Sequence, residues 1–220
     1  MNLRYLINAA TALCFAAILT GCGRSPQVSF YTLGSAVKGG TAVPPKSTPS
    51  VSVVNITLPI LVDRPQLVEN VTINRLEIQE SHRWAEPLKN GISRLLAENL
   101  AARLGTDMVT AYPQNAVGEP DYKVSVDIQR FEVLGENVSV DALWSIRKTA
   151  VTASDQGKQD KAPFTKTGRS QLRESRSGAG YEALVAAYNR AITSLGNDIA
   201  VAIRADLEGV KSEFDQKAAP

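Results

Sequence analysis

The sequence is poor in the residues that perform most enzyme chemistry. It contains one histidine, His82, and two cysteines, Cys14 and Cys22, among 220 residues. A single histidine excludes a His-rich metal site, and a Ser–His–Asp triad would have to use His82 with no local motif for its serine. The chain also lacks a nucleophile elbow, a Walker loop and a glycine-rich dinucleotide motif. These absences point away from the common classes of enzyme.

Aromatic residues and excess charge are also scarce. Aromatics make up 6% of the chain and the formal net charge is +2, so neither stacking platforms for bases nor a basic patch is indicated. A glycosidase-type carboxylate pair stays open, since any two of the 22 acids could meet, but no stretch favours one. We therefore expect no nucleic-acid partner, no metal and no cofactor.

Residues 1–21 have the features of a cleaved signal peptide. Arg4 supplies a short positive region, and an apolar stretch over residues 9–19 follows that is too short to span a bilayer. The stretch ends in "LTGC" at residues 19–22, which resembles a bacterial lipobox. Cys22 is therefore predicted to carry a diacylglycerol on its sulfur and an acyl group on its new amino terminus. The alternative is a plain secretion signal that is cut near the same place.

Removal of the signal would leave no free thiol in the mature chain. Cys14 would leave with the signal and Cys22 would be blocked by lipid, so no disulfide or catalytic cysteine is expected. Gly23 follows Cys22, where the inner-membrane retention rule of enteric lipoproteins uses aspartate. This favours the outer membrane, with the domain facing the periplasm.

Residues 23–50 predict a tether between the anchor and the domain. A short segment near residues 29–33 is apolar and typical of a strand, and the Gly-, Pro-, Ser- and Thr-rich stretch that follows is typical of a flexible linker. A tether of about 25 residues would span roughly 25–30 Å as a coil. We therefore expect the domain to reach a partner away from the membrane surface.

Residues 51–203 predict a single α+β domain. Alternating or β-prone segments indicate strands near 54–60, 66–69, 72–78, 108–112, 122–128, 138–146 and 163–174. The two long runs on either side of "LGEN" predict an antiparallel hairpin. Apolar residues at helical spacing indicate one helix near 85–104 and another that starts near residue 180. The expected architecture is an antiparallel or mixed sheet with two main helices packed on one face.

The stretch "SHRWAEPLKNG", residues 81–91, is interpreted as the start of the first helix. Trp84 is expected to pack there, Glu86 to lie at the positive helix end and Pro87 to occupy the first turn. His82, although flanked by carboxylates, is expected to be a surface side chain close to the helix cap rather than an acid–base group.

Residues 204–220 are predicted to continue the second helix as an extension or tail. Their apolar residues Leu207, Val210 and Phe214 form a stripe that needs a neighbour, from this protomer or from another. They are therefore a candidate interface with a partner protein or with a second copy in a homo-oligomer.

Several segments resemble one known family. They are "YTL" (31–33), "LPILVDRPQLV" (58–68), "RWAEPLKNGISRLLAENLAARL" (83–104) and "YEALVAAYNRAITSLGNDIAVAI" (181–203). They are similar to the ABC-type transport auxiliary lipoproteins, which include those of paraquat-inducible operons. The resemblance implies an outer-membrane lipoprotein that docks to mammalian-cell-entry (MCE) domain proteins and to inner-membrane transporter components. Such systems move lipids or other hydrophobic molecules between membranes, and their lipoprotein is not an enzyme.

The two most specific segments of this resemblance supply the candidate site residues, which are Asp63, Arg64, Pro65, Arg83, Trp84 and Glu86. We expect these residues first to fix a structural corner of the domain and second to contribute to the partner surface. Two rival functions stay open: an outer-membrane assembly or structural lipoprotein without a transport role, and a lipid-anchored hydrolase that uses His82.

Overall fold

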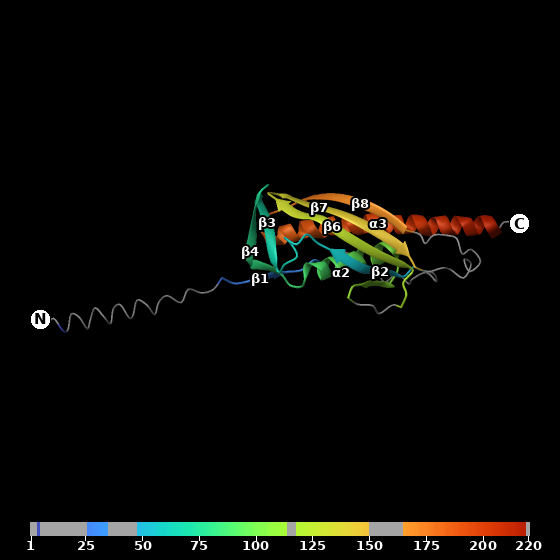
Figure 1. The fold of residues 1–220 in the computed structure, drawn as a ribbon, viewed down its shortest axis with the longest axis horizontal. Helices are drawn as coiled ribbons and strands as arrows, with labels where there is room; N and C mark the ends of the chain where they lie inside the picture. The colour runs from blue at the N-terminus through green and yellow to red at the C-terminus, as the bar shows by residue number, and fades with distance from the viewer. Residues whose placement is uncertain (1–3, 5–25, 35–47, 114–117, 150–164, 219–220) are drawn as a thin grey trace.

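The computed structural model describes residues 4, 26–34, 48–113, 118–149 and 165–218, and of residues 210–218 it describes the backbone alone. Within this part of the chain, eight strands form one curled, mixed sheet. Two helices lie side by side against one of its faces (Figure 1). The α+β class, the mixed sheet and the two covering helices are confirmed.

The long strands β6 (Tyr122–Leu134), β7 (Asn137–Lys148) and β8 (Thr165–Ser175) form an antiparallel meander. The side chains of β6 and β7 alternate between a buried, apolar face and a more polar face, as the sequence predicts for a sheet covered on one side. The predicted hairpin is confirmed, and it is longer than the sequence pattern indicated because pairing continues from Tyr122 to Leu134.

The other side of β6 carries two parallel strands. β2 (Val51–Thr57) pairs with the first half of β6, and β5 (Val109–Ala111) pairs with β2. β2 ends before Pro59, because the Pro59 carbonyl accepts backbone hydrogen bonds from Val62 and Asp63 and closes a turn. The chain leaves the ladder at this turn.

The hairpin of β3 (Gln66–Thr72) and β4 (Arg75–Trp84) closes one end of the sheet. It joins the far end of β6 through Asn70 and Leu134, and β1 (Ser29–Tyr31) adds to its outer edge as a parallel strand. Figure 1 shows these three strands together at one end of the molecule.

The first helix, α2 (Leu88–Leu104), starts later than the sequence suggested. Pro87 is its N-cap, with φ −51° and ψ 127°, and is not in the first turn. His82, Arg83 and Trp84 belong to β4. They precede the helix as the sequence predicted, and their backbone forms a ladder with β1.

The second helix, α3 (Tyr181–Ala218), has 38 residues and extends beyond the sheet at the end opposite β1 (Figure 1). It packs against α2 and buries a stripe of apolar residues: Leu184, Ala191, Ile192, Leu195, Ile199 and Ile203. Gly196 marks the close approach, since a Cβ there would lie 3.0 Å from the Cβ of Asn99.

Candidate functional site

The segment that follows the predicted lipidation site is held tightly by the domain. Cys22 lies outside the described residues, but Leu33, shortly after β1, is 1% exposed. The Arg94 guanidinium donates to the Leu33 carbonyl at 2.6 Å and to the Thr32 hydroxyl at 3.1 Å. The backbone N–H of Gly34 donates to Asn189 Oδ1 at 3.1 Å. Both helices therefore clamp the end of this segment.

This arrangement makes the tether shorter than the sequence predicts. Because β1 is paired with β4, the chain between Cys22 and the domain consists of residues 23–28 alone. The long Gly- and Pro-rich stretch connects β1 to β2 instead, and residues 35–47 within it lie outside the described part of the chain. The stretch therefore links two strands of one fold rather than separating the anchor from the fold.

The two segments of the candidate site meet through their backbones. The N–H of Trp84 donates to the Pro65 carbonyl at 2.7 Å. Asp63 forms an ion pair of 2.6 Å with Lys89 in the first turn of α2. The Asp-Arg-Pro turn thus connects the end of β4 to the start of α2, as a corner of the domain.

Trp84 belongs to the core beneath this corner. It is 7% exposed, and its ring meets the ring of Tyr188 edge-on at 6.4 Å. Tyr188 in turn stacks on Phe131 at 3.9 Å with an interplanar angle of 3°. Aromatic pairs in these geometries stabilise a core beyond their buried area, so Trp84 packs α3 against the hairpin end of the sheet.

The charged members of the candidate site do not converge on one point. Arg83 pairs with its neighbour Glu80 at 3.4 Å, whereas Glu86 pairs with Arg94 at 2.7 Å on the side of α2. The hydrogen bond that Arg94 donates to Glu86 raises the pKa of Arg94 above its ordinary value. Arg64 Nε is buried and has no hydrogen-bond partner among the described residues. The six residues therefore surround a corner but form no single constellation.

The sequence did not predict the cluster of side chains around His82. His82 stacks on Tyr181 with ring centroids 3.8 Å apart, and its Nδ1 lies 2.9 Å from the Tyr31 hydroxyl. Tyr181 donates to Glu69 at 3.0 Å. Burial, and then this hydrogen bond, raises the pKa of Tyr181 to about 12. Arg176 completes the cluster with an ion pair of 3.1 Å to Glu69.

This cluster joins β1, β3, β4 and the start of α3. His82 was expected near the start of the first helix, and its ring lies between Tyr31 on β1 and Tyr181, the first residue of α3. Those partners are 51 and 99 positions away along the chain, so no local motif could have revealed them.

No large cavity accompanies these side chains in the described part of the chain. The best-formed cavity there has a volume of about 10 Å³ and is lined in part by Trp84, Leu88 and Tyr188. That volume holds about one water molecule. The described residues contain no group of three or more His, Cys, Asp or Glu that could hold a metal ion.

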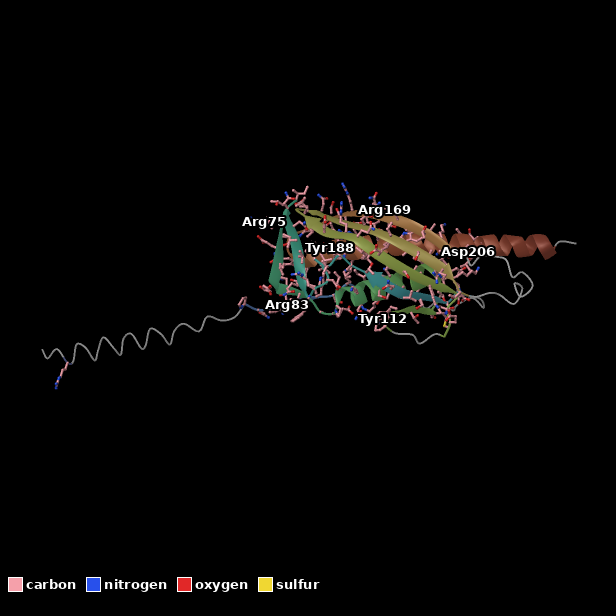
Figure 2. The ribbon with its side chains drawn as sticks, viewed as in Figure 1. Arg75, Arg83, Tyr112, Arg169, Tyr188 and Asp206 are labelled. Carbon is pink, nitrogen blue, oxygen red and sulfur yellow. The ribbon has the colours of Figure 1, made fainter. Side chains whose placement is uncertain are left out.

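The far end of the molecule is fixed by a second polar contact. The Tyr122 hydroxyl donates to Asp206 on α3 at 2.6 Å, and Lys148 pairs with the same carboxylate at 3.0 Å. Burial, and then the hydrogen bond to Asp206, raises the pKa of Tyr122. Figure 2 shows Asp206 at the end of the sheet from which α3 projects.

Leu207 follows Asp206 and packs against the domain's own core. It therefore has its neighbour within the protomer, and only the helix beyond it extends free of the sheet (Figure 1). The backbone is helical to Ala218. The side chains of Val210 and Phe214 lie outside the described part, so their role as an interface stays a prediction.

Comparisons with known proteins agree with this fold. Residues 31–200 match the family described as ABC-type transport auxiliary lipoprotein component. An uncharacterised protein of known structure is 17% identical with a TM-score of 0.58, covering 81% of this chain and 99% of its own. A Xanthomonas campestris protein of the DUF330 family is 16% identical with a TM-score of 0.52, covering 82% and 99%. The comparison with curated proteins gives no match.

Proposed function

The chain belongs to the ABC-type transport auxiliary lipoprotein family, and we propose that it is the lipid-anchored docking component of an ABC/MCE-type transport system. In this role the protein faces the periplasm from the outer membrane and binds an MCE-domain protein and, through it, inner-membrane transporter components. The system moves lipids or other hydrophobic molecules between membranes. The lipoprotein itself performs no chemistry and needs no cofactor beyond the acyl chains on Cys22.

The observation that carries this proposal is that β1 and the free end of α3 lie at opposite ends of the molecule. β1, which follows the predicted anchor, lies at one end of the sheet, and α3 projects from the opposite end (Figure 1). With Cys22 acylated, the hairpin end lies at the membrane and α3 points into the periplasm. The extension beyond Leu207 is then the first part of the domain that a periplasmic partner would meet.

The absence of a substrate-sized cavity in the described part supports docking over hydrolysis. His82 is stacked on Tyr181 and hydrogen-bonded to Tyr31, so both its ring face and its Nδ1 are engaged. These contacts hold the ring between β1 and the start of α3, which is a packing role. In addition, no helix among the described residues is long and apolar enough to cross a bilayer.

Shortening α3 tests the docking role. A variant without residues 208–220 keeps Asp206 and Leu207, and should therefore keep its fold and thermal stability. We expect it to lose at least tenfold in capture of the MCE protein encoded beside it, compared with the full chain. Removal of residues 219–220 alone is the matched control and should leave capture unchanged. Unchanged capture by the longer deletion, at equal stability, would assign docking to another surface.

Lipidation and the transport role have their own tests. Cys22→Ser should move the protein from the membrane to the soluble periplasmic fraction, and mass spectrometry of the wild type should show three acyl chains on Cys22. Adjacent genes for a permease, an ATPase and an MCE protein would support transport. Their absence would favour the alternative, an outer-membrane assembly or structural lipoprotein without a transport role.

A further inference from the structure

Large apolar side chains are exposed at the hairpin end of the sheet. Phe30 on β1 is 66% exposed, Ile73 in the hairpin turn 85%, and Leu76 and Ile78 on β4 are 37% and 38% exposed. We call these four residues the end-face patch. Exposed apolar groups that gather in one place mark contact surfaces for a protein or a membrane.

The strand register places this patch on the outer side of the sheet. Leu67 on β3 is buried, at 1% exposed. Side chains alternate along a strand, so Gln66, Val68 and Asn70 point away from the core. Residues that pair directly with them share their side.

The partners of these outward residues include the patch. Ile78 pairs with Val68, and Leu76 pairs with Asn70. Arg83 pairs with the outward Gln66 and, on its other edge, with Phe30. Phe30 therefore lies on the same outer face as Leu76 and Ile78, at the other end of β4 from the hairpin turn.

The chain from the predicted anchor to this face is short. Phe30 follows Cys22 by eight residues, and eight residues extended at roughly 3.6 Å each reach at most about 29 Å. β1 itself is fixed to the domain by β4 and by the Arg94 and Asn189 contacts that follow it. With Cys22 in the bilayer, Phe30 and the adjoining outer face of β4 are held within this reach of the lipid.

We propose that the end-face patch lies in the interfacial layer of the phospholipid bilayer that holds the anchor. The proposal rests on acylation of Cys22, which is part of the proposed function. Phe30, Leu76 and Ile78 would insert their apolar side chains at the boundary between the lipid headgroups and the acyl chains, as interfacial segments do. The bilayer contact and the short spacer together hold the domain upright, with α3 pointing away from the membrane.

The charges around the patch suit a phospholipid surface. Arg83 lies between Phe30 and β3, and Arg75 lies beside the hairpin turn. Figure 2 shows both arginines at this end of the molecule. Each is partly exposed and pairs with one carboxylate, Glu80 or Glu77, at 3.4 and 4.0 Å. Guanidinium groups hydrogen-bond phosphate well, so both arginines can turn to headgroups from the rim of the patch.

Spin labels test this contact in the full mature protein. An acylated Cys22 leaves no other thiol, so Phe30→Cys and Ile78→Cys can each carry one nitroxide. The labelled proteins are reconstituted in vesicles of phosphatidylethanolamine and phosphatidylglycerol, and collision rates with oxygen and with a water-soluble nickel chelate are measured. Val201→Cys on α3 is the matched control, because Val201 is an apolar side chain that is 56% exposed away from the patch.

We expect the ratio of oxygen to nickel collisions at positions 30 and 78 to exceed that at 201 by at least threefold in vesicles. Equal ratios at the three positions would overturn the proposal. Protection that comes with dipolar broadening between labels, and that disappears on dilution with unlabelled protein, would also overturn it and assign the patch to contact between copies.

Failure of this proposal is distinguishable from failure of the proposed function. The acyl mass on Cys22 and the capture of the MCE protein are measured on the same preparations. Intact acylation and capture with a water-exposed patch would reject the membrane contact alone. A missing acyl mass would reject the premise of both.

Discussion

Replacing Gly168 by alanine would bring the added methyl carbon into steric overlap with the indole ring of Trp144. The two residues pair directly across β7 and β8, and the added Cβ would lie 2.1 Å from Cζ2 and 2.5 Å from Cε2 of the ring. Trp144 is 8% exposed. Its Nε1 donates to Ser170, and Ser170 donates to Asp198 on α3. The ring is therefore held by a chain of hydrogen bonds that ends on α3.

The magnitude follows from the two ways in which the structure can respond. If the ring stays, β8 must move outward, and forcing extra carbon into a packed site costs about 1–3 kcal/mol. If the ring turns out, Trp144 loses its hydrogen bond, worth about 1 kcal/mol, and part of its buried area. Complete loss of a buried tryptophan side chain costs about 3–5 kcal/mol. We expect Gly168→Ala to lower the free energy of unfolding by about 2–4 kcal/mol.

Urea unfolding followed by far-UV circular dichroism and by tryptophan fluorescence measures this loss. Gly118→Ala is the control, since nothing lies within 4 Å of a Cβ at that position. In a double-mutant cycle, Trp144→Leu removes the ring, so Gly168→Ala should cost much less in that background. A loss below about 0.5 kcal/mol, or additive effects of the two substitutions, would refute the packing argument, because contacting residues are expected to couple.

Three further predictions concern single side chains. Arg94→Met should increase the rate of amide hydrogen exchange around Leu33 at least tenfold. It should also lower the free energy of unfolding by about 1 kcal/mol, because Arg94 is a partly exposed, hydrogen-bonded cation. An unchanged exchange rate would exclude the clamp. The hydrogen bond from Arg169 holds the pKa of Asp141 below its ordinary value, so the stability it gives is present above about pH 3.9 and is lost as the pH falls through the lowered pKa. Arg169→Gln should raise the Asp141 pKa in an NMR titration, and no rise would contradict the assignment. The raised pKa of Tyr181, about 12, means that its contribution to stability is lost as the pH rises from about 10 toward 12. In the Tyr181→Phe variant, the urea concentration at half-unfolding should fall less steeply between about pH 10 and pH 12 than in the wild type. An equally steep fall would show that Tyr181 is not the source of the loss.

The sequence predicted the parts of the fold in which one face differs from the other. β6 and β7 alternate between apolar and polar residues because helices cover one side and solvent the other. α3 could be located from apolar residues at helical spacing because its stripe packs on the sheet and on α2. Trp144 lies on the apolar register of its strand and is 8% exposed.

The sequence did not predict the hairpin end correctly, and the reason is physical. Much of β4 is exposed on its outer face and carries the mixed sequence "RLEIQESHRW", so no alternation marks where the strand stops. Its last residues are held by β1, which follows a different part of the chain. The partners of His82 likewise come from distant elements, and pairwise contacts of this kind are invisible to local patterns.

The tether was misjudged because composition alone cannot distinguish a linker outside a domain from a loop within it. Residues 34–50 have the composition of a flexible spacer, and that composition is equally suited to a long connection between two strands. The distinction depends on whether β1 is bound, and its binding is decided by Arg94, Asn189 and the edge of β4. None of these contacts leaves a signal in residues 29–33 themselves.

The position of β1 also limits how an anchored domain can search for a partner. A spacer of about 25 residues would let the domain tumble over roughly 25–30 Å, and docking would then pay for the lost orientation. A spacer of residues 23–28 restricts the domain before any partner arrives. The 38 residues of α3 span about 57 Å at 1.5 Å per residue, and the C-terminal part of the helix projects from the end opposite β1. An acylated Cys22 would therefore present the same end of the helix to every partner, and this preorganisation lowers the entropic cost of docking.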